Sequence, residues 1–187
     1  MRQTVIGLLG HKRSGKDSIY RCLADNGLRG IHRLAFADEL KVEVAKVCGV
    51  TLNFLEEFKE VFRPMLQWWG TDFRRRFFHD DYWIRKVREH YWQRVTVAEN
   101  IGEPVVVCVF TDVRFPNEAA LVRELGGKLW RVVRDIPGSD PHSSETVMNN
   151  FAVDRVIENN GTLEDLRHKA MSALVEDFNW DTLWIVH

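Results

Sequence analysis

Near the start of the chain runs Val5-Ile6-Gly7-Leu8-Leu9-Gly10-His11-Lys12-Arg13-Ser14-Gly15-Lys16-Asp17-Ser18, an apolar segment of strand length followed by a loop between two glycines and then by a helical pattern. Gly10 and Gly15 let the backbone turn and approach a ligand closely. The N–H groups of the loop and the N-terminus of the following helix would face an anion, and Lys16 would add a positive charge for its outer phosphates. This pattern predicts a phosphate-binding loop, and the alternative interpretation is an ordinary glycine-rich turn.

Asp17 stands where such loops usually carry Ser or Thr, whose hydroxyl binds Mg²⁺. A carboxylate is also a hard oxygen ligand, so Asp17 could hold the ion directly or through a water molecule. The neighbouring Ser18 could supply the hydroxyl instead. We therefore expect Mg²⁺ at this loop, with Asp17 and Ser18 as candidate ligands.

The composition is typical of one folded domain, because 45% of the 187 residues are hydrophobic and 28% are charged. The formal net charge of -1 creates no overall field that attracts nucleic acid or membrane, so any anion binding must be local. The 3 cysteines lie far apart without metal-ligand spacing, which suggests a reducing compartment. We see no cationic leader and no apolar run that could span a bilayer. We expect a cytoplasmic protein that binds neither membrane nor nucleic acid.

Apolar runs of strand length alternate with helical patterns along the chain. The expected strands are residues 4–9, 31–36, 105–110, 128–134 and 155–158. The expected helices are residues 17–24, 38–48, 116–125 and 163–177, with glycines after the third and Thr162 as the cap of the fourth. This alternation predicts an α/β fold in which helices cover both faces of a parallel sheet and ligands bind at the carboxyl ends of the strands.

Residues 38–103 contain no strand signal, and we interpret them as a helical insertion that binds substrate. Four apolar residues recur there every four positions and so mark one helix face: Trp83, Val87, Tyr91 and Val95. Core packing is the favoured interpretation of this face, with ligand stacking as the alternative.

Two other features of this interval bear on a substrate. Trp68 and Trp69 adjoin Gly70-Thr71-Asp72, a turn signal, so one of them could stack on a base or pack in the core. The triplet Arg74-Arg75-Arg76 is either a solvated helix face or a face that meets an anionic substrate, and the phosphate loop favours the second interpretation.

The expected strand 105–110 is followed by Thr111-Asp112-Val113-Arg114. Asp112 would lie beside the phosphate loop and hold Mg²⁺ or its waters. Arg114 could neutralise a phosphoryl group during its transfer, and a surface salt bridge is the alternative. Asp38 and Lys41 follow the second expected strand, so we expect them at the same crevice.

Six motifs follow one another along the chain: Gly10-x-Lys12-Arg13-Ser14-Gly15-Lys16-Asp17, Leu34-Ala35-Phe36-Ala37-Asp38-x-Leu40-Lys41, Trp69-Gly70-Thr71-Asp72, Asp81-Tyr82-Trp83, Asp112-x-Arg114-x-x-Asn117-Glu118-Ala119 and His142-x-Ser144-Glu145. In this order they resemble bacteriophage deoxynucleoside monophosphate kinases. The resemblance implies a P-loop three-layer α/β/α fold with a five-stranded parallel sheet, a helical monophosphate-binding region and a lid. It also implies transfer of the γ-phosphoryl group of ATP to a deoxynucleoside monophosphate, with Mg²⁺, in the supply of DNA precursors.

The resemblance further implies roles for single residues. Lys12 through Ser18 would hold the ATP phosphates and Asn160 would contact the adenine, while Lys16, Asp112 and Arg114 would form the catalytic set. The acceptor nucleotide would meet Asp38, Lys41, Arg63, Trp69, Asp72, Arg74, Arg75 and Arg114. His142 and Glu145 receive no role.

We expect a single domain, with its core at residues 1–37 and 104–187, the insertion at about 38–103 and a lid-like loop at about 134–150. Arg134 or Arg155 could contact phosphate when this lid closes. The apolar tail from Trp180 to Val186 could cover the core or form a homodimer contact, and we favour a homodimer. A phage origin would place the protein in the host cytoplasm.

Two other interpretations stay open. Animal-type phosphomevalonate kinases are similar in the phosphate loop, in Phe58-Lys59-Glu60-x-Phe62-Arg63 and in Val156-Ile157-Glu158-Asn159. The aromatic insertion favours a nucleotide over that smaller acceptor. The basic and aromatic residues between Trp68 and Trp92 could instead hold a single-stranded nucleic acid without turnover, although acidic residues interrupt them.

Overall fold

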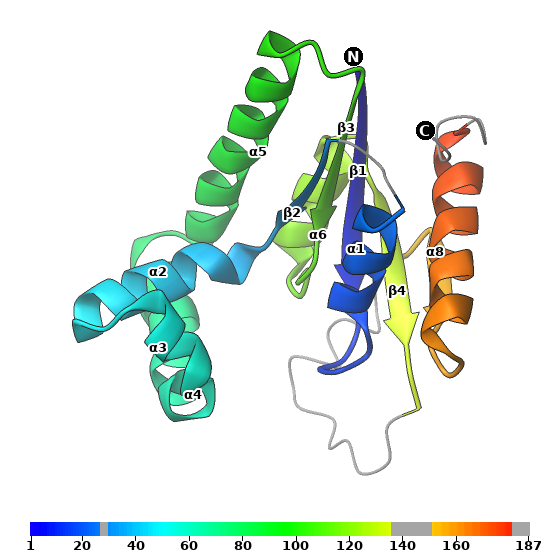
Figure 1. Ribbon diagram of the computed structural model, residues 1–187. Helices are drawn as coiled ribbons and strands as arrows, with labels where there is room; N and C mark the ends of the chain where they lie inside the picture. Colours follow the sequence, from blue (N-terminus) through cyan, green and yellow to red (C-terminus); the bar gives the residue numbers. More distant parts are fainter. Residues whose placement is uncertain (27–29, 136–150, 181–187) are drawn as a thin grey trace. The chain divides into compact units, whose positions relative to one another are not determined.

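The protein is described by a computed structural model that covers residues 1–26, 30–135 and 151–180. The fold contains a five-stranded sheet of order β2-β3-β1-β4-β5, and Figure 1 shows β1 between β3 and β4. The strands are β1 Arg2–Leu9, β2 Ile31–Leu34, β3 Val105–Phe110, β4 Lys128–Val133 and β5 Arg155–Glu158. Strand β1 pairs in parallel with β3 and β4, and β4 pairs in parallel with β5. The predicted α/β fold with a five-stranded parallel sheet is confirmed.

The central strands are buried on both faces, which explains their unbroken apolar sequences. Every residue of β3 is buried, and so are the last six residues of β1. A parallel sheet covered by helices on both sides requires such continuous hydrophobic runs rather than an alternating pattern. The expected strands at residues 105–110 and 155–158 match the observed bounds of β3 and β5.

Three helices pack against the sheet: α1 Lys16–Ala24, α6 Pro116–Glu124 and α8 Leu163–Phe178. Ile6 and Leu8 belong to one core cluster with residues of α1 and α8, so these two helices share a face of the sheet. A side chain at position 7 would point to the opposite face, because side chains alternate along a strand. A Cβ atom on Gly7 would lie 2.9 Å from Val122 of α6, so α6 covers that face. The result is three layers, with the sheet between the helices.

A second compact unit spans Leu34–Trp92, while Met1–Arg33 and Gln93–His187 form the unit that contains the sheet. Its helices are α2 Phe36–Cys48, α3 Leu52–Glu57, α4 Lys59–Gln67, the π-helix η1 Trp68–Phe78 and the beginning of α5 Tyr82–Asn100. The small core of this unit contains Val44, Ala45 and Leu55, with Phe62 and Trp69 packed against it.

The π-helix η1 corrects one prediction. Gly70-Thr71-Asp72 is not a turn, because these residues lie inside the continuous helix η1. Gly70 is buried against Leu40 of α2, where a Cβ atom would lie 2.9 Å from the leucine side chain. The Gly70 carbonyl also accepts a hydrogen bond of 3.0 Å from the indole of Trp83. Close packing, and not a change of chain direction, therefore explains this glycine.

The apolar stripe of α5 lies in the core, as predicted. Trp83, Val87, Tyr91 and Val95 are each at most 2% exposed. Trp180 is also buried and joins the core of the sheet-containing unit, while residues 181–186 of the predicted dimer contact lie outside the described residues. None of the helices in the described part of the chain is both long and apolar enough to cross a lipid bilayer.

Candidate functional site

The loop between β1 and α1 has the backbone of a phosphate cradle. Gly10 has φ 151° and Gly15 has φ 106°, values that favour glycine, and Arg13 also has a positive φ of 65°. The N–H of Ser14 donates to the carbonyl of His11 at 3.1 Å, which closes the turn. Helix α1 begins immediately afterwards at Lys16, so its N-terminus opens onto the loop.

Two side chains of this loop support anion binding. The Lys16 ammonium donates to the carbonyls of Gly10 and His11 at 2.7 and 2.8 Å, so its charge lies over the loop. Ser14 is only 1% exposed. Its hydroxyl has no hydrogen-bond partner within residues 1–26, 30–135 and 151–180. A buried hydroxyl of this kind calls for a partner. A phosphate oxygen in the cradle would supply one.

Asn159, which directly follows β5, supports the loop from behind. Its side-chain amide donates to the Ser14 carbonyl at 2.7 Å. A Cβ atom on Gly15 would lie 2.2 Å from the same amide nitrogen, so only glycine leaves room for this contact. Asn159 was not among the predicted site residues. The available signal was a polar residue directly after an expected strand.

The residues after β3 lie beside the loop. The N–H of Val113 donates to the carbonyl of Leu8 at 3.2 Å, which brings residues 112–114 to the end of β1. Asp112 is partly exposed and Arg114 is exposed. Both residues therefore lie at the carboxyl edge of the sheet, next to the phosphate loop, as predicted.

Glu118 organises this segment, although it was not among the predicted site residues. Glu118 is only 2% exposed. Its carboxylate accepts hydrogen bonds from the backbone N–H groups of Arg114 and Phe115, at 2.7 and 3.0 Å. The signal was a Glu two residues after Pro116, the pattern of a capping box at a helix N-terminus. Through these bonds Glu118 holds the backbone that carries Arg114.

The ends of β4 and β5 complete this edge. Arg134 is exposed after β4. The amide of Asn160 donates to the Asp135 carboxylate at 2.8 Å, and its oxygen accepts from the Asp135 N–H at 2.9 Å. Arg155 stands instead at the amino end of β5 and is paired with Asp177 at 2.6 Å. Its place argues against the predicted phosphate contact of Arg155. His142, Glu145 and residues 136–150 of the predicted lid lie outside the described residues.

The candidate metal ligands offer oxygen atoms but no complete cage. The Asp17 side chain is 73% exposed and lies 3.9 Å from Arg33, while Ser18 and Asp112 are partly exposed. Within the described residues no group of three or more His, Cys, Asp or Glu side chains converges on one point. This arrangement fits Mg²⁺, which usually binds one or two carboxylates together with phosphate oxygens and water.

In the second compact unit, Leu34–Trp92, which we call the helical unit, Glu43 of α2 is surrounded by hydrogen-bond donors. Its carboxylate accepts from Trp69 at 3.0 Å, from Arg74 at 2.8 Å and from the Tyr82 hydroxyl at 2.5 Å, and Lys86 lies 3.4 Å away. Burial opposes its charge, but the hydrogen bonds from Tyr82, Trp69 and Arg74 prevail and hold the pKa of Glu43 below its ordinary value. These donors therefore favour the ionised form of the Glu43 carboxylate.

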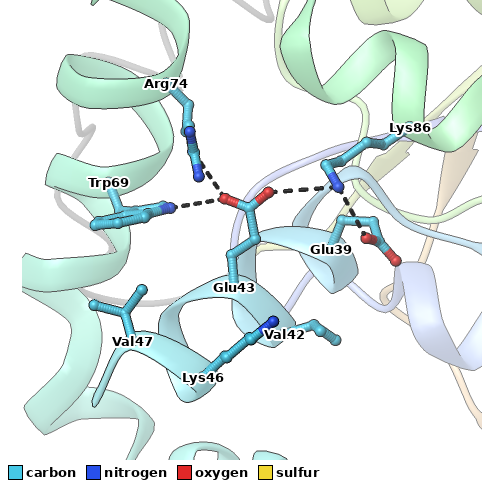
Figure 2. Close-up of a pocket in the computed structure, with 8 residues that line it drawn as sticks. All are labelled: Glu39, Val42, Glu43, Lys46, Val47, Trp69, Arg74 and Lys86. Carbon is cyan, nitrogen blue, oxygen red and sulfur yellow. Dashed lines mark hydrogen bonds and ion pairs between the residues drawn. The ribbon is translucent and has the colours of Figure 1, made fainter. Parts of the chain in front are cut away.

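Glu43 forms part of a pocket of about 360 Å³ (Figure 2). The pocket lies between α2, η1 and α5 and is lined by Glu39, Val42, Glu43, Lys46, Val47, Trp69, Arg74 and Lys86. Figure 2 shows Arg74 and Trp69 reaching Glu43 from one side and Lys86 from the other. Of the predicted acceptor residues, the structure therefore brings Trp69 and Arg74 together.

The other predicted acceptor residues of this unit, Asp38, Lys41, Arg63, Asp72 and Arg75, are not among the described residues that line the pocket. Lys41 pairs with Glu56 of α3 at 2.6 Å and with Asp38 at 3.4 Å. Arg63 pairs with Glu60 at 2.5 Å, and Asp72 is exposed on η1. Arg75 is 9% exposed and donates to the Asp80 carbonyl at 3.4 Å. Positions 41 and 43 of a helix differ by about 200°, so Lys41 and Glu43 leave α2 on nearly opposite sides.

A parallel five-stranded sheet with a phosphate loop between its central strand and the next helix defines a P-loop-type α/β/α fold. The profile of the deoxynucleotide monophosphate kinase family matches residues 37–170. The chain is also 31% identical, over 91% of its length and 95% of the relative's, to the "Putative deoxynucleotide monophosphate kinase" of Acanthamoeba polyphaga mimivirus. The chain belongs to the deoxynucleotide monophosphate kinase family, and the predicted resemblance to kinases of this type is confirmed.

Solved structures agree with the fold. The Thermus thermophilus protein TT1252 superposes with a TM-score of 0.53 and 19% identity, covering 95% of this chain and 99% of that one. A sugar kinase from a Janibacter species superposes with a TM-score of 0.52 and 14% identity, covering 100% of both chains. At such low identity these matches concern the fold alone. The family and the relative support a nucleotide kinase, a phosphotransferase.

Proposed function

We propose that the protein transfers the γ-phosphoryl group of ATP to a deoxynucleoside 5′-monophosphate and so supplies the diphosphate precursor of DNA synthesis. The observation that carries this proposal is the phosphate loop of a chain of this family. There a lysine ammonium lies over the loop carbonyls, and a buried serine hydroxyl lacks a partner within the described residues. The phage setting and the cytoplasmic location belong to the same proposal.

The donor side of the reaction is assigned to the sheet-containing unit. The backbone N–H groups from Lys12 to Ser18 would bind the phosphates of ATP, and Lys16 would leave its loop carbonyls to follow the migrating group. Arg114 would neutralise charge on the transferring phosphoryl, because its backbone is held at the carboxyl edge by Glu118. Asn160 would contact the adenine, and Arg134 would add a phosphate contact.

Magnesium would be held by Asp17, Ser18 and Asp112, directly or through water, and when bound it supplies positive charge to the phosphate oxygens. The protein contributes the fixed positions of these oxygen ligands. Because phosphoryl transfer depends mostly on positioning and electrostatics, the chain needs no covalent intermediate.

The acceptor side is assigned to the helical unit. Of the three consecutive arginines, Arg74 is the one we assign to the acceptor, because it lines a pocket together with Trp69. Arg75 is buried and already bonded to a backbone carbonyl, which disfavours its predicted contact. Asp38, Lys41, Arg63 and Asp72 stay predicted acceptor residues, and a homodimer stays a prediction.

The alternatives are disfavoured by the family. A phosphomevalonate acceptor and a non-catalytic single-strand binder were both compatible with parts of the sequence, but the family profile covers most of the chain, including the aromatic helical unit. Binding to single strands would also weaken steeply as the salt concentration rises, which provides a simple check.

The test is a coupled assay of ADP release with Mg²⁺ and ATP, run with dAMP, dGMP, dCMP, dTMP, the ribonucleotides and mevalonate 5-phosphate as acceptors. We expect turnover with deoxynucleoside monophosphates and none with mevalonate 5-phosphate. Turnover with mevalonate 5-phosphate alone, or salt-sensitive binding of single strands without any ADP release, would overturn the proposal.

A further inference from the structure

The Arg74 guanidinium is held more firmly than a surface arginine. Its Nε donates to Glu43 at 2.8 Å. Its central carbon also lies 4.8 to 5.4 Å from the centres of four aromatic rings, those of Trp69, Phe73, Phe78 and Tyr82. Cation–π contacts with several rings and one charge-assisted hydrogen bond together fix both the position and the plane of the guanidinium.

The Arg74 terminal nitrogens are the groups left for a ligand. In the part of the chain that the structure describes, Arg74 bonds to Glu43 through Nε only, and neither terminal nitrogen donates to another protein group. Two parallel N–H donors on a guanidinium match two oxygens of a phosphate. The wall of the pocket therefore carries a preoriented fork for an anion, with Glu43 as the group that orients it.

The pocket could also be explained by charge alone. Its lining contains three cations, Lys46, Arg74 and Lys86, and two carboxylates, Glu39 and Glu43, so its formal charge is about +1. Removal of the Glu43 charge would raise this value and, by simple electrostatics, strengthen the binding of an anion. A residue that positions Arg74 has the opposite effect, because its removal frees the guanidinium to move.

We propose that Glu43 is a positioning residue that orients Arg74 toward the 5′-phosphate of the acceptor nucleotide in this pocket. The inference rests on the proposed function, since it names the residue that prepares the acceptor site of that reaction. Glu43 touches Trp69, Arg74, Tyr82 and Lys86 at once, so it couples α2, η1 and α5 in one arrangement.

The test compares wild type with Glu43→Gln, which removes the charge at nearly constant size. We measure kcat, the KM of deoxynucleoside monophosphate and the KM of ATP, together with calorimetric binding of dAMP, dGMP, dCMP and dTMP. We expect a rise of about tenfold or more in the acceptor KM and Kd, as for a lost charge-assisted contact, with the ATP KM unchanged. An unchanged or lower acceptor KM and Kd would overturn the proposal.

A matched control exists in the other unit. Asp177 of α8 is a carboxylate with the same kinds of donor, since it accepts from Arg155 at 2.6 Å and from the indole of Trp130 at 2.7 Å. Asp177→Asn should lower the melting temperature and leave the acceptor KM unchanged. If both variants lower the melting temperature and neither changes the acceptor KM, Glu43 is structural only.

A double-mutant cycle with Arg74→Lys identifies the route of the effect. If Glu43 acts through Arg74, Glu43→Gln adds little to the acceptor KM of Arg74→Lys, whereas independent effects would multiply and contradict the proposal. Should Gln at this position prevent folding, Glu43→Asp enters the same cycle, because it keeps the charge and withdraws the carboxylate by one methylene.

Tyr82 provides a spectroscopic readout of the arrangement. Burial, and then the hydrogen bond and charge of Glu43, raise the pKa of Tyr82 to about 12. We expect Glu43→Gln to lower this pKa, measured as tyrosinate absorbance with Tyr82→Phe as the blank. A wild type that neither releases ADP nor binds these nucleotides would overturn both the function and the inference. An active wild type with an unaffected Glu43→Gln variant would overturn the inference alone.

Discussion

The side-chain amide of Asn159 donates to the main-chain carbonyl of Ser14 at 2.7 Å, although 145 residues separate them in the sequence. This bond joins the end of β5 to the phosphate loop between β1 and α1. The Asn159 amide also occupies the space that a side chain at position 15 would need. The shape of the loop is therefore maintained by the far end of the sheet as well as by its own glycines.

We expect Asn159→Ala to lower the free energy of unfolding by about 1–2 kcal/mol, because it leaves the buried Ser14 carbonyl without this donor. It should also raise the KM of ATP more than the KM of the acceptor, because the loop loses its support. Denaturant titration and steady-state kinetics measure the two effects. Asn160→Ala is the comparison, since Asn160 pairs with Asp135 at the exposed surface and tests the predicted adenine contact. Equal ATP KM values for Asn159→Ala and wild type would contradict the support role.

Lys16→Met should keep the fold and lose most of the turnover. The loop N–H groups still bind phosphates in this variant, but the charge that would follow the migrating phosphoryl group is gone, so we expect kcat to fall by about 100-fold or more. ATP binding by calorimetry and the melting temperature are the controls. A near-normal kcat would refute the assignment of this loop to the reacting phosphates.

Asp17→Ser tests the unusual residue of the loop. The Asp17 side chain is 73% exposed and 3.9 Å from Arg33, so the loop does not depend on it for packing. We expect activity to survive with a higher requirement for Mg²⁺ or a changed preference for Mn²⁺, because a hydroxyl replaces a carboxylate as the ligand. Kinetics against the concentration of each metal measure this. Collapse of activity at every metal concentration would show instead that the negative charge is needed.

Stability should depend on Asp177 in acid. Burial opposes its charge, yet the hydrogen bonds from Arg155 and Trp130 and the charge of Arg155 lower its pKa. A lowered pKa in the folded state contributes stability above the unfolded value, which is about 3.9 for Asp, and that stability is lost as the pH falls through the folded value. We expect the free energy of unfolding of Asp177→Asn to fall less than that of wild type below about pH 4. Parallel curves for the two proteins in denaturant titrations between pH 7 and pH 2 would contradict this.

Local sequence patterns were enough to predict the phosphate loop and most of the secondary structure. The glycines at positions 10 and 15 have the positive φ values that a tight loop needs, and the apolar runs became the five strands. The apolar stripe of α5 followed from its period of about four residues. Such features depend on neighbours in the sequence, so the sequence contains their full cause.

One prediction was wrong and another is disfavoured, because packing overrode local preference. Gly70-Thr71-Asp72 has the composition of a turn, but Leu40 and Trp83 pack against Gly70 within η1. Arg155 was a candidate phosphate ligand in the sequence. In the structure it lies at the amino end of β5, where it pairs with Asp177. In both cases a contact with a residue distant in the sequence decided the outcome, and no local pattern reports it.

The sequence by itself determined the phosphate loop, the alternation of strands and helices and the membership of a kinase family, because backbone conformation and hydrophobic periodicity are local properties. Only the tertiary structure showed that Asn159 supports the loop, that Glu118 holds the backbone of Arg114 and that Glu43 collects Trp69, Arg74 and Tyr82. These three residues act through hydrogen bonds to partners that folding brings near. Their roles follow from where their partners lie in space, and a single sequence does not contain those distances.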